Sequence, residues 1–238
     1  MKFKNPKVVI LCGGLGSRLS EETKVRPKPM VKIGSKPILV HIMEIYKKYG
    51  FSKFVLAAGY KHEIIKKYFK KNRKFDVKVI NTGTKTLTGK RIYRLKKILQ
   101  KEKYFMLTYG DGLTDQNLKK LLNFHIKHKR VATITAVRPP VKFGELILKK
   151  DSVKNFKEKP QVKFGWINGG FFVFDKKIFN FIKDKNVMLE REPLTKLVNV
   201  GQLKAYKHKG FWQCMDTVRD KLLLNKMLKS KKAPWIKK

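Results

Sequence analysis

Short apolar runs alternate with amphipathic stretches along the first half of the chain, and this alternation constrains the fold more than any other feature. The strand-like runs cover residues 8–12, 54–58, 77–80 and 105–107, and the helical stretches cover residues 38–49, 64–69 and 92–99. Ser35 is placed to cap the first helix, with Pro37 in its first turn. Strands and helices in this order form βαβ units. We therefore predict a Rossmann-like α/β fold, in which helices sandwich a mostly parallel, mixed sheet.

A glycine-rich segment follows the first strand-like run. Residues 13–16 read Gly-Gly-Leu-Gly, and the missing Cβ atoms let the backbone turn sharply and come close to a ligand. Arg18 and Lys28 add positive charge beside free backbone N–H groups, which favours binding of a polyphosphate. The segment is not a Walker loop, because no lysine follows Gly16 in the required place. It is not a dinucleotide fingerprint either, because the prolines on both sides of Lys28 forbid a regular helix there. A plain turn without a ligand is the alternative interpretation.

Length and composition fit one globular domain. The chain has 238 residues, of which 42% are hydrophobic, and no run approaches the roughly 20 apolar residues of a membrane helix. The first residues show no apolar segment typical of a secretory signal. The two cysteines, Cys12 and Cys214, form neither a disulfide framework nor a metal quartet. We expect no membrane partner and a reducing, cytoplasmic location.

The formal net charge of +41 is extreme for a metabolic enzyme and normally suggests a nucleic-acid or anionic-membrane partner. However, only nine of the 58 basic residues are arginines, and the lysines are spread along helix faces. Dedicated nucleic-acid readers concentrate arginine and stacking aromatics on one surface. We interpret the lysines mainly as a solvated surface, with no specific nucleic-acid partner, although non-specific binding to polyanions should follow from the charge.

Six motifs occur in order along nearly the whole chain and resemble the sugar-1-phosphate nucleotidyltransferases, in particular the glucose-1-phosphate cytidylyltransferase branch. They are GGLGSRLSEETKVRPKPM (13–30), TGTKTLTGKR (82–91), TYGDG (108–112), FKEKP (156–160), WINGGFFVF (166–174) and FWQCMDT (211–217). The resemblance implies the nucleotide-diphospho-sugar transferase type of fold. It also implies transfer of a cytidylyl group from CTP to α-D-glucose 1-phosphate, giving CDP-glucose and pyrophosphate. The product would enter deoxysugar and lipopolysaccharide O-antigen synthesis.

The resemblance implies one nucleotidyltransferase domain over residues 1–238. Residues 1–130, approximately, would form the nucleotide-binding half, and residues 131–238 the sugar-binding half with the C-terminal helix. Strand-like runs at 146–148, 153–156 and 171–174 are expected to form a mixed extension over the sugar side of the cleft.

The family pattern also implies roles for individual residues, with Arg18, Lys28 and Asp111 as catalytic residues. The implied nucleotide contacts are Leu11, Cys12, Gly13, Gly14, Leu15, Gly16, Ser17, Arg18, Lys28, Thr86, Arg91 and Gly110. The implied sugar-phosphate contacts are Glu158, Lys159, Asn168 and Gly169.

Two aspartates are the candidate ligands of Mg²⁺, which prefers a few carboxylates together with phosphate oxygens and water. Asp111 follows a strand-like run and is flanked by glycines, although Asp-Gly is also a common turn dipeptide. Asp216 could equally cap the C-terminal helix that begins near Thr217, and only the resemblance favours the metal role.

Three alternatives to this function remain open. One is the same reaction with UTP or dTTP, and another is a basic nucleic-acid-binding protein on an inactive transferase scaffold. The third is a regulatory sugar-nucleotide binder, which would bind CTP without releasing pyrophosphate. The family also implies a homo-oligomer. The segment between Phe69 and Thr82 is shorter than in the fuller cytidylyltransferases, which affects any subunit or nucleotide contact that this segment makes in them.

Overall fold

The computed structural model describes residues 5–138, 145–149, 151–157 and 165–236. Its strands are β1 (Val8–Cys12), β2 (Lys32–Ile33), β3 (Lys36–Pro37), β4 (Lys53–Ala58), β5 (Asp76–Asn81), β6 (Tyr104–Tyr109), β7 (Gly112–Thr114), β8 (Ala132–Val137), β9 (Glu145–Lys149), β10 (Ser152–Lys157), β11 (Ile167–Asp175), β12 (Leu203–His208) and β13 (Trp212–Cys214). Its α-helices are α1 (Ser20–Thr23), α2 (Ile38–Lys48), α3 (His62–Lys71), α4 (Thr88–Tyr93), α5 (Lys96–Leu99), α6 (Leu118–His128), α7 (Glu192–Asn199) and α8 (Val218–Lys229). Short 3₁₀ helices are η1 (Ser17–Leu19), η2 (Lys28–Met30) and η3 (Lys176–Asn180).

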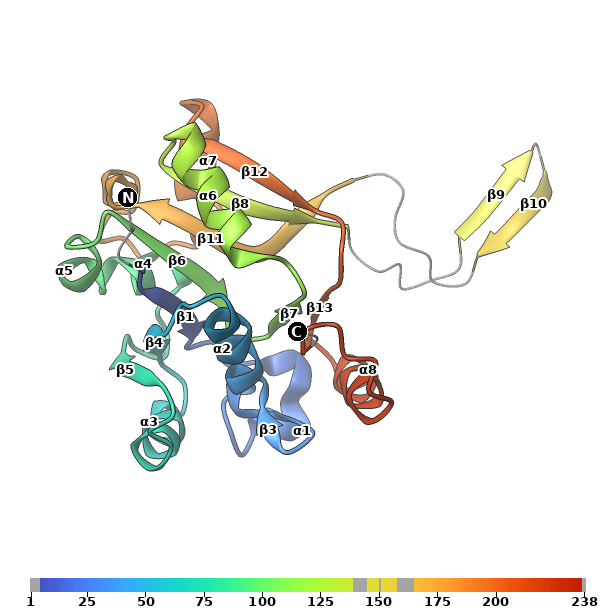
Figure 1. Cartoon of the computed structure of the whole chain (residues 1–238), viewed down its shortest axis with the longest axis horizontal. Coiled ribbons are helices and arrows are strands. Elements are labelled where there is room, and N and C mark those ends of the chain that lie inside the picture. Colours follow the sequence, from blue (N-terminus) through green and yellow to red (C-terminus); the bar gives the residue numbers. More distant parts are fainter. Residues whose placement is uncertain (1–4, 139–144, 150, 158–164, 237–238) are drawn as a thin grey trace.

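A seven-stranded sheet with the strand order β12-β8-β11-β6-β1-β4-β5 forms the centre of the described structure (Figure 1). Strands β6, β1, β4 and β5 pair in parallel, as do β8 and β12, whereas β11 runs antiparallel to both of its neighbours. The predicted mostly parallel, mixed sheet is thus confirmed. Because β1, β4 and β6 point the same way, their carboxyl ends meet at one edge, where ligands bind in sheets of this kind.

Both faces of the inner strands β1, β4, β6, β8 and β11 are buried, as their near-continuous apolar runs require, whereas the edge strands β5 and β12 are only partly covered. Within β1, the side chains of Val8, Ile10 and Cys12 belong to one hydrophobic core and those of Val9 and Leu11 to a second. Helices α2, α3, α6 and α8 contribute to the first core, and α4, α5, η3 and α7 to the second. The helices therefore sandwich the sheet, as predicted.

The structure differs from the prediction in two helices. Ser35 does not cap α2, because the helix begins after Pro37, which is itself the N-cap residue. The helix expected over 92–99 divides into α4 and α5, and the bonds Leu95 N to Ile92 O and Ile98 N to Leu95 O show the tighter i→i+3 spacing of a 3₁₀ turn between them. Residues 72–75 alone connect α3 to β5.

The expected extension over the sugar side is wrong for the segment 171–174. This segment lies in β11, which pairs with β6 and β8 inside the central sheet. Phe171 and Val173 are buried in one core and Phe172 and Phe174 in the other, a pattern that only a central strand can satisfy. β9 and β10 pair with each other as a separate two-stranded sheet.

Candidate active site

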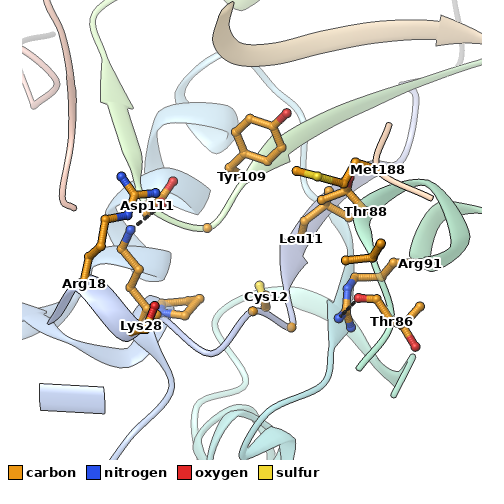
Figure 2. A pocket seen from close by; sticks show the side chains of 17 residues that line it. Leu11, Cys12, Arg18, Lys28, Thr86, Thr88, Arg91, Tyr109, Asp111 and Met188 are labelled. Atoms are coloured by element: carbon orange, nitrogen blue, oxygen red, sulfur yellow. Dashed lines mark hydrogen bonds and ion pairs between the residues drawn. The ribbon is translucent and has the colours of Figure 1, made fainter. Parts of the chain in front are cut away.

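A cavity of about 380 Å³ lies at the edge of the sheet where β1 and β6 end. Its lining comes from the glycine loop, η1, η2, the segment 86–91 around the start of α4, and the end of β6, with Met188 from the connection before α7. In Figure 2, Arg18, Lys28 and Asp111 lie at one end of the cavity and Thr86 and Arg91 at the other, with Leu11 and Cys12 between them. The cavity therefore has a cationic and acidic end and a separate end around Arg91.

The glycine loop takes its shape from close backbone approaches. Gly16 has a φ of 69°, and an added Cβ would lie 2.8 Å from the side chain of Thr23. At Gly13 a Cβ would lie 1.9 Å from Nη1 of Arg91, so the guanidinium packs directly on the loop. At Gly14, in contrast, an added Cβ would meet nothing within 4 Å. The backbone conformation requires glycine at position 16, and glycine at position 13 leaves the space that the Arg91 guanidinium fills.

Arg91 is almost fully buried at its end of the cavity and is held by three hydrogen bonds. Nη1 donates to Ala58 O at 3.0 Å and to Thr82 Oγ1 at 2.5 Å, and Nη2 donates to Thr86 O at 2.6 Å. Burial lowers the pKa of Arg91 from its usual value, but a guanidinium keeps its charge at physiological pH. These bonds fix the guanidinium and use three of its five N–H groups, which leaves two donors for whatever occupies this end.

At the opposite end, Lys28 joins the two candidate aspartates. Its Nζ lies 2.7 Å from Asp111 Oδ2 and 2.5 Å from Asp216 Oδ1. Burial alone would lower the pKa of Lys28, but the two carboxylates outweigh it and raise the pKa. Asp216 is affected in the opposite direction: burial would raise its pKa, but the hydrogen bond from Lys28 together with the charges of Lys28 and Arg18 outweighs burial and lowers the pKa. Lys28 and Asp216 are thus both charged at neutral pH.

Backbone pairing explains why residues so distant in sequence meet here. β7, directly after Asp111, pairs antiparallel with β13, which ends two residues before Asp216. In addition, Met215 N donates to Asp111 O at 2.9 Å. The pairing of these two short strands fixes the separation of the two carboxylates.

The structure separates the two roles that the sequence left open for Asp216. The N-cap of α8 is Thr217, whose side chain accepts from Asp220 N while the Asp220 side chain accepts from Thr217 N, a complete capping box. Asp216 instead directs its carboxylate to Lys28 and to Arg18, whose Nη1 lies 2.7 Å from Asp216 Oδ2. The Arg18 side chain is 74% exposed, so it is free to turn toward a ligand.

The donor set fits a hard divalent cation. Two carboxylates converge on one point that the Lys28 ammonium occupies, and carboxylate oxygens are the ligands that Mg²⁺ prefers. No group of three or more His, Cys, Asp or Glu side chains suited to a metal occurs in the described part of the chain. The remaining ligands of such an ion would have to come from substrate phosphates and water.

A second cavity of about 210 Å³ adjoins the first and shares Arg18, Tyr109 and Asp111 with it. Asn168 and Gly169 of β11 and Trp212 of β13 line it. Trp212 Nε1 donates to Gly169 O at 2.7 Å, and a Cβ at Gly169 would lie 2.8 Å from Val137 Cγ1. The two cavities meet where the charged residues are concentrated.

Tyr109 stands between the two cavities with its hydroxyl group hydrogen-bonded to Glu190. Burial raises the pKa of Tyr109 well above its usual value, and the Glu190 carboxylate raises it further. The phenol therefore stays protonated and acts as a donor at any physiological pH.

Most residues that the sequence predicted for the site line one of the two cavities. The first holds Leu11, Cys12, Gly13, Gly14, Gly16, Ser17, Arg18, Lys28, Thr86, Arg91, Gly110 and Asp111, and the second holds Asn168, Gly169 and Asp216. Leu15 lines neither cavity, and its side chain is 56% exposed. Glu158 and Lys159 lie outside the described residues.

To the first cavity the structure adds lining residues that the sequence did not single out, namely Pro29, Leu87, Thr88, Tyr109 and Met188. Tyr109 could have been found from its position directly before Gly110 and Asp111 at the end of an apolar run. Met188 and the nearby Glu190 carry no such signal, because they lie in an irregular segment far along the chain.

Comparisons with known proteins agree with this geometry. The sequence profile of the nucleotidyl transferase family matches residues 7–220. A glucose-1-phosphate cytidylyltransferase of Salmonella typhimurium is 41% identical over 252 residues, which cover 96% of this chain and 98% of that protein. The alignment is 252 positions long, which is more than the 238 residues of this chain. The alignment therefore contains gaps in this chain, and the relative has at least one longer segment.

Two solved structures superpose on nearly the whole chain. HddC from Yersinia pseudotuberculosis has a TM-score of 0.76 at 28% identity, covering 94% of this chain and 99% of that one. A UDP-glucose pyrophosphorylase in complex with UDP-glucose has a TM-score of 0.74 at 17% identity, covering 96% and 100%. The second likeness concerns the fold alone, and it agrees with the predicted nucleotide-diphospho-sugar transferase type. In the described part of the chain, no helix has the length and apolar character needed to cross a membrane.

Proposed function

Since the chain belongs to the nucleotidyl transferase family, we propose that it is a glucose-1-phosphate cytidylyltransferase, which makes CDP-glucose and pyrophosphate from CTP and α-D-glucose 1-phosphate. The observation that carries the proposal is the meeting of two cavities at one charged centre, with Arg18, Tyr109 and Asp111 common to both. The level of identity with a curated cytidylyltransferase over nearly both full lengths supports the choice of substrates.

The reaction needs little covalent help from the protein. An oxygen of the sugar 1-phosphate forms a bond to the α-phosphorus of CTP, and the bond between that phosphorus and the oxygen bridging to the β-phosphorus breaks, so that pyrophosphate leaves. The protein must hold two polyanions in line and stabilise the charge that develops.

The larger cavity is the proposed CTP site. The base and ribose would lie along residues 11–14 with Thr86, Gly110 and Arg91, whose fixed N–H donors suit the acceptor atoms of cytosine. The triphosphate would lie against Gly16, Ser17, Arg18 and Lys28. Leu15 belongs to the proposed nucleotide contacts only through the family pattern.

The smaller cavity is the proposed glucose 1-phosphate site, with Asn168 and Gly169 toward the sugar hydroxyls. The family pattern adds Glu158 and Lys159. In this scheme residues 1–130, approximately, form the nucleotide half of a single domain and residues 131–238 the sugar half.

We propose Asp111 and Asp216 as the residues that would hold Mg²⁺. When bound, the ion would neutralise phosphate charge during the transfer. The role of this chain's own residues is to present both carboxylates from paired strands and to supply Lys28 and Arg18 for the phosphates.

Further parts of the proposal concern the setting of the enzyme. A cytoplasmic location is consistent with Cys12 and Cys214 being free thiols. A homo-oligomer and a place in O-antigen synthesis rest on the family resemblance alone.

The decisive experiment measures pyrophosphate release by the purified protein with Mg²⁺, glucose 1-phosphate and, in turn, CTP, UTP and dTTP. We expect kcat/KM with CTP to exceed the other two by at least about tenfold, since a buried polar site rejects a base that leaves its donors unpaired. A higher value with UTP or dTTP would reassign the nucleotide. No turnover with any of the three would remove the enzyme assignment and favour the inactive-scaffold alternative.

A further inference from the structure

A chain of hydrogen bonds links the smaller cavity to the wall of the larger one. Asn168 Nδ2 donates to the Tyr109 hydroxyl at 3.3 Å, and that hydroxyl donates to Glu190 Oε1. The other oxygen of the carboxylate, Oε2, accepts from Thr88 Oγ1 at 2.7 Å, and Leu189 N donates to the same Thr88 hydroxyl at 2.8 Å. Glu190 is the midpoint of this chain.

The direction of each link follows from what the groups can donate and accept. Gly170 N donates to Asn168 Oδ1 at 2.8 Å, so the amide oxygen is fixed and Nδ2 must face Tyr109. A carboxylate accepts only, so Glu190 turns the Tyr109 hydrogen toward itself and leaves the phenol oxygen to accept from Asn168. One hydrogen of Asn168 Nδ2 is then free to face the smaller cavity that Asn168 lines.

The segment that carries Glu190 is hydrogen-bonded to residues 87–89, beside the larger cavity. Leu87 N donates to Asn186 Oδ1 at 2.9 Å, and Gly89 N donates to Val187 O at 3.0 Å. These bonds fasten the segment 186–190 to the residues around Thr88. The carboxylate is thus placed by backbone contacts that do not depend on Tyr109.

We propose that Glu190 is a positioning residue of the sugar site: by accepting from Tyr109 it orients Asn168 as a hydrogen-bond donor to a hydroxyl of the sugar phosphate. This rests on the proposed function, since the smaller cavity must be the sugar site. Nothing in the motifs singles out Glu190, which acts through Tyr109 and Asn168 and lines neither cavity.

The test is a double-mutant cycle read by KM and kcat. Glu190→Ala removes the acceptor, and we expect KM for glucose 1-phosphate to rise about five- to tenfold, the usual effect of one lost hydrogen bond. KM for the nucleotide should change less than about twofold. Glu190→Gln keeps an oxygen that can face Tyr109 and should restore most of the wild-type KM. The matched control is Glu192→Ala, since Glu192 pairs with Lys196 on α7 and touches neither cavity.

The Tyr109→Phe background separates positioning from a purely structural role. Without the hydroxyl, Glu190→Ala should add less than about a twofold increase in KM for the sugar phosphate. Equal losses in both backgrounds, or an unchanged KM in the Glu190→Ala single variant, would overturn the proposal. If the wild type turns over no nucleotide, the proposed function fails, and the same variants are compared by calorimetric titration with glucose 1-phosphate. Wild-type protein that does not bind this ligand overturns the Glu190 proposal as well.

Discussion

Lys28 lies between the carboxylates of Asp111 and Asp216, which would otherwise repel each other. Two carboxylates face the same point, and the ammonium of Lys28 pairs with both while Arg18 pairs with one. The four formal charges cancel, so the centre is neutral before substrates arrive. Substrate phosphates would compete for Lys28 and Arg18 and release the carboxylates for a divalent ion. The arrangement therefore suits a site that exchanges internal ion pairs for ligand contacts.

The first prediction at this scale concerns Asp111. Asp111→Asn removes one proposed metal ligand while keeping the size of the side chain, and we expect kcat to fall by at least ~10²-fold because metal and electrostatic stabilisation are lost. Steady-state pyrophosphate release measures the effect, and circular dichroism checks the fold.

Asp151→Asn is the matched control, because Asp151 is exposed in the turn between β9 and β10. A near wild-type kcat in the Asp111 variant would remove this residue from the reaction centre.

Local sequence could predict the chemistry of single residues but not all of their partners. Arg18, Lys28 and Asp111 were found because each lies next to a glycine-rich or strand-ending motif. The role of Asp216 could not be decided, since an aspartate before a helix is also a good cap, and only the Thr217–Asp220 capping box of the structure excludes that role. The role of Glu190 could not be predicted from the sequence, because its partner Tyr109 is 81 residues away.

At the scale of elements, the glycine loop and the segment that begins α4 form one unit. Arg91 of α4 packs against Gly13 and bonds to the carboxyl end of β4 at Ala58 and to Thr82 just after β5. The loop, two strand ends and the helix thus share a single buried guanidinium. A substitution at Gly13 of the glycine loop should therefore displace Arg91 at the other end of the cavity.

Gly13→Ala tests this coupling. The new Cβ would overlap Arg91 and force it from its three hydrogen bonds, so we expect the free energy of unfolding to fall by about 2 kcal/mol or more. Urea denaturation of the ligand-free protein measures the change.

Gly14→Ala is the matched control, since its Cβ would stand in open space and should alter stability by less than about 0.5 kcal/mol. Equal effects at both positions would contradict a role for Arg91 packing.

The sequence predicts the strands that consist of clear apolar runs. It does not predict the elements whose position depends on pairing with strands distant in sequence. Strands β1, β4, β5 and β6 follow from their apolar runs. The position of β11 does not, because alternate burial of Phe171 and Phe172 in two cores depends on strands that lie far away in sequence. The pairing of β7 with β13, on which the site depends, involves two strands too short to produce any periodic signal.

At the scale of the whole molecule, the charge of +41 is carried by a lysine-rich surface. Lysine pairs at 47–48, 66–67 and 119–120 are exposed on their helices, as expected for a solvated face. Such a surface attracts any polyanion, and the attraction is independent of the chemistry in the cavities.

We expect the protein to bind duplex DNA without sequence preference. The observed binding constant should fall steeply and log-linearly between about 50 and about 200 mM salt, because lysine contacts to phosphates release counterions. Fluorescence anisotropy with two unrelated duplexes measures this. Binding that discriminates between the duplexes, or that persists at high salt, would indicate a specific nucleic-acid site and contradict the solvated-surface interpretation.

The pairing of β7 with β13 also determines when activity can arise during synthesis. The glycine loop and Asp111 leave the ribosome well before Asp216, which follows only after the sugar-side strands have been made. A nascent chain, or a fragment cleaved before β13, would keep the nucleotide cavity's glycine loop without the second carboxylate. Partial products that end before β13 should therefore be catalytically silent, and only a polypeptide that includes Asp216 can consume substrate.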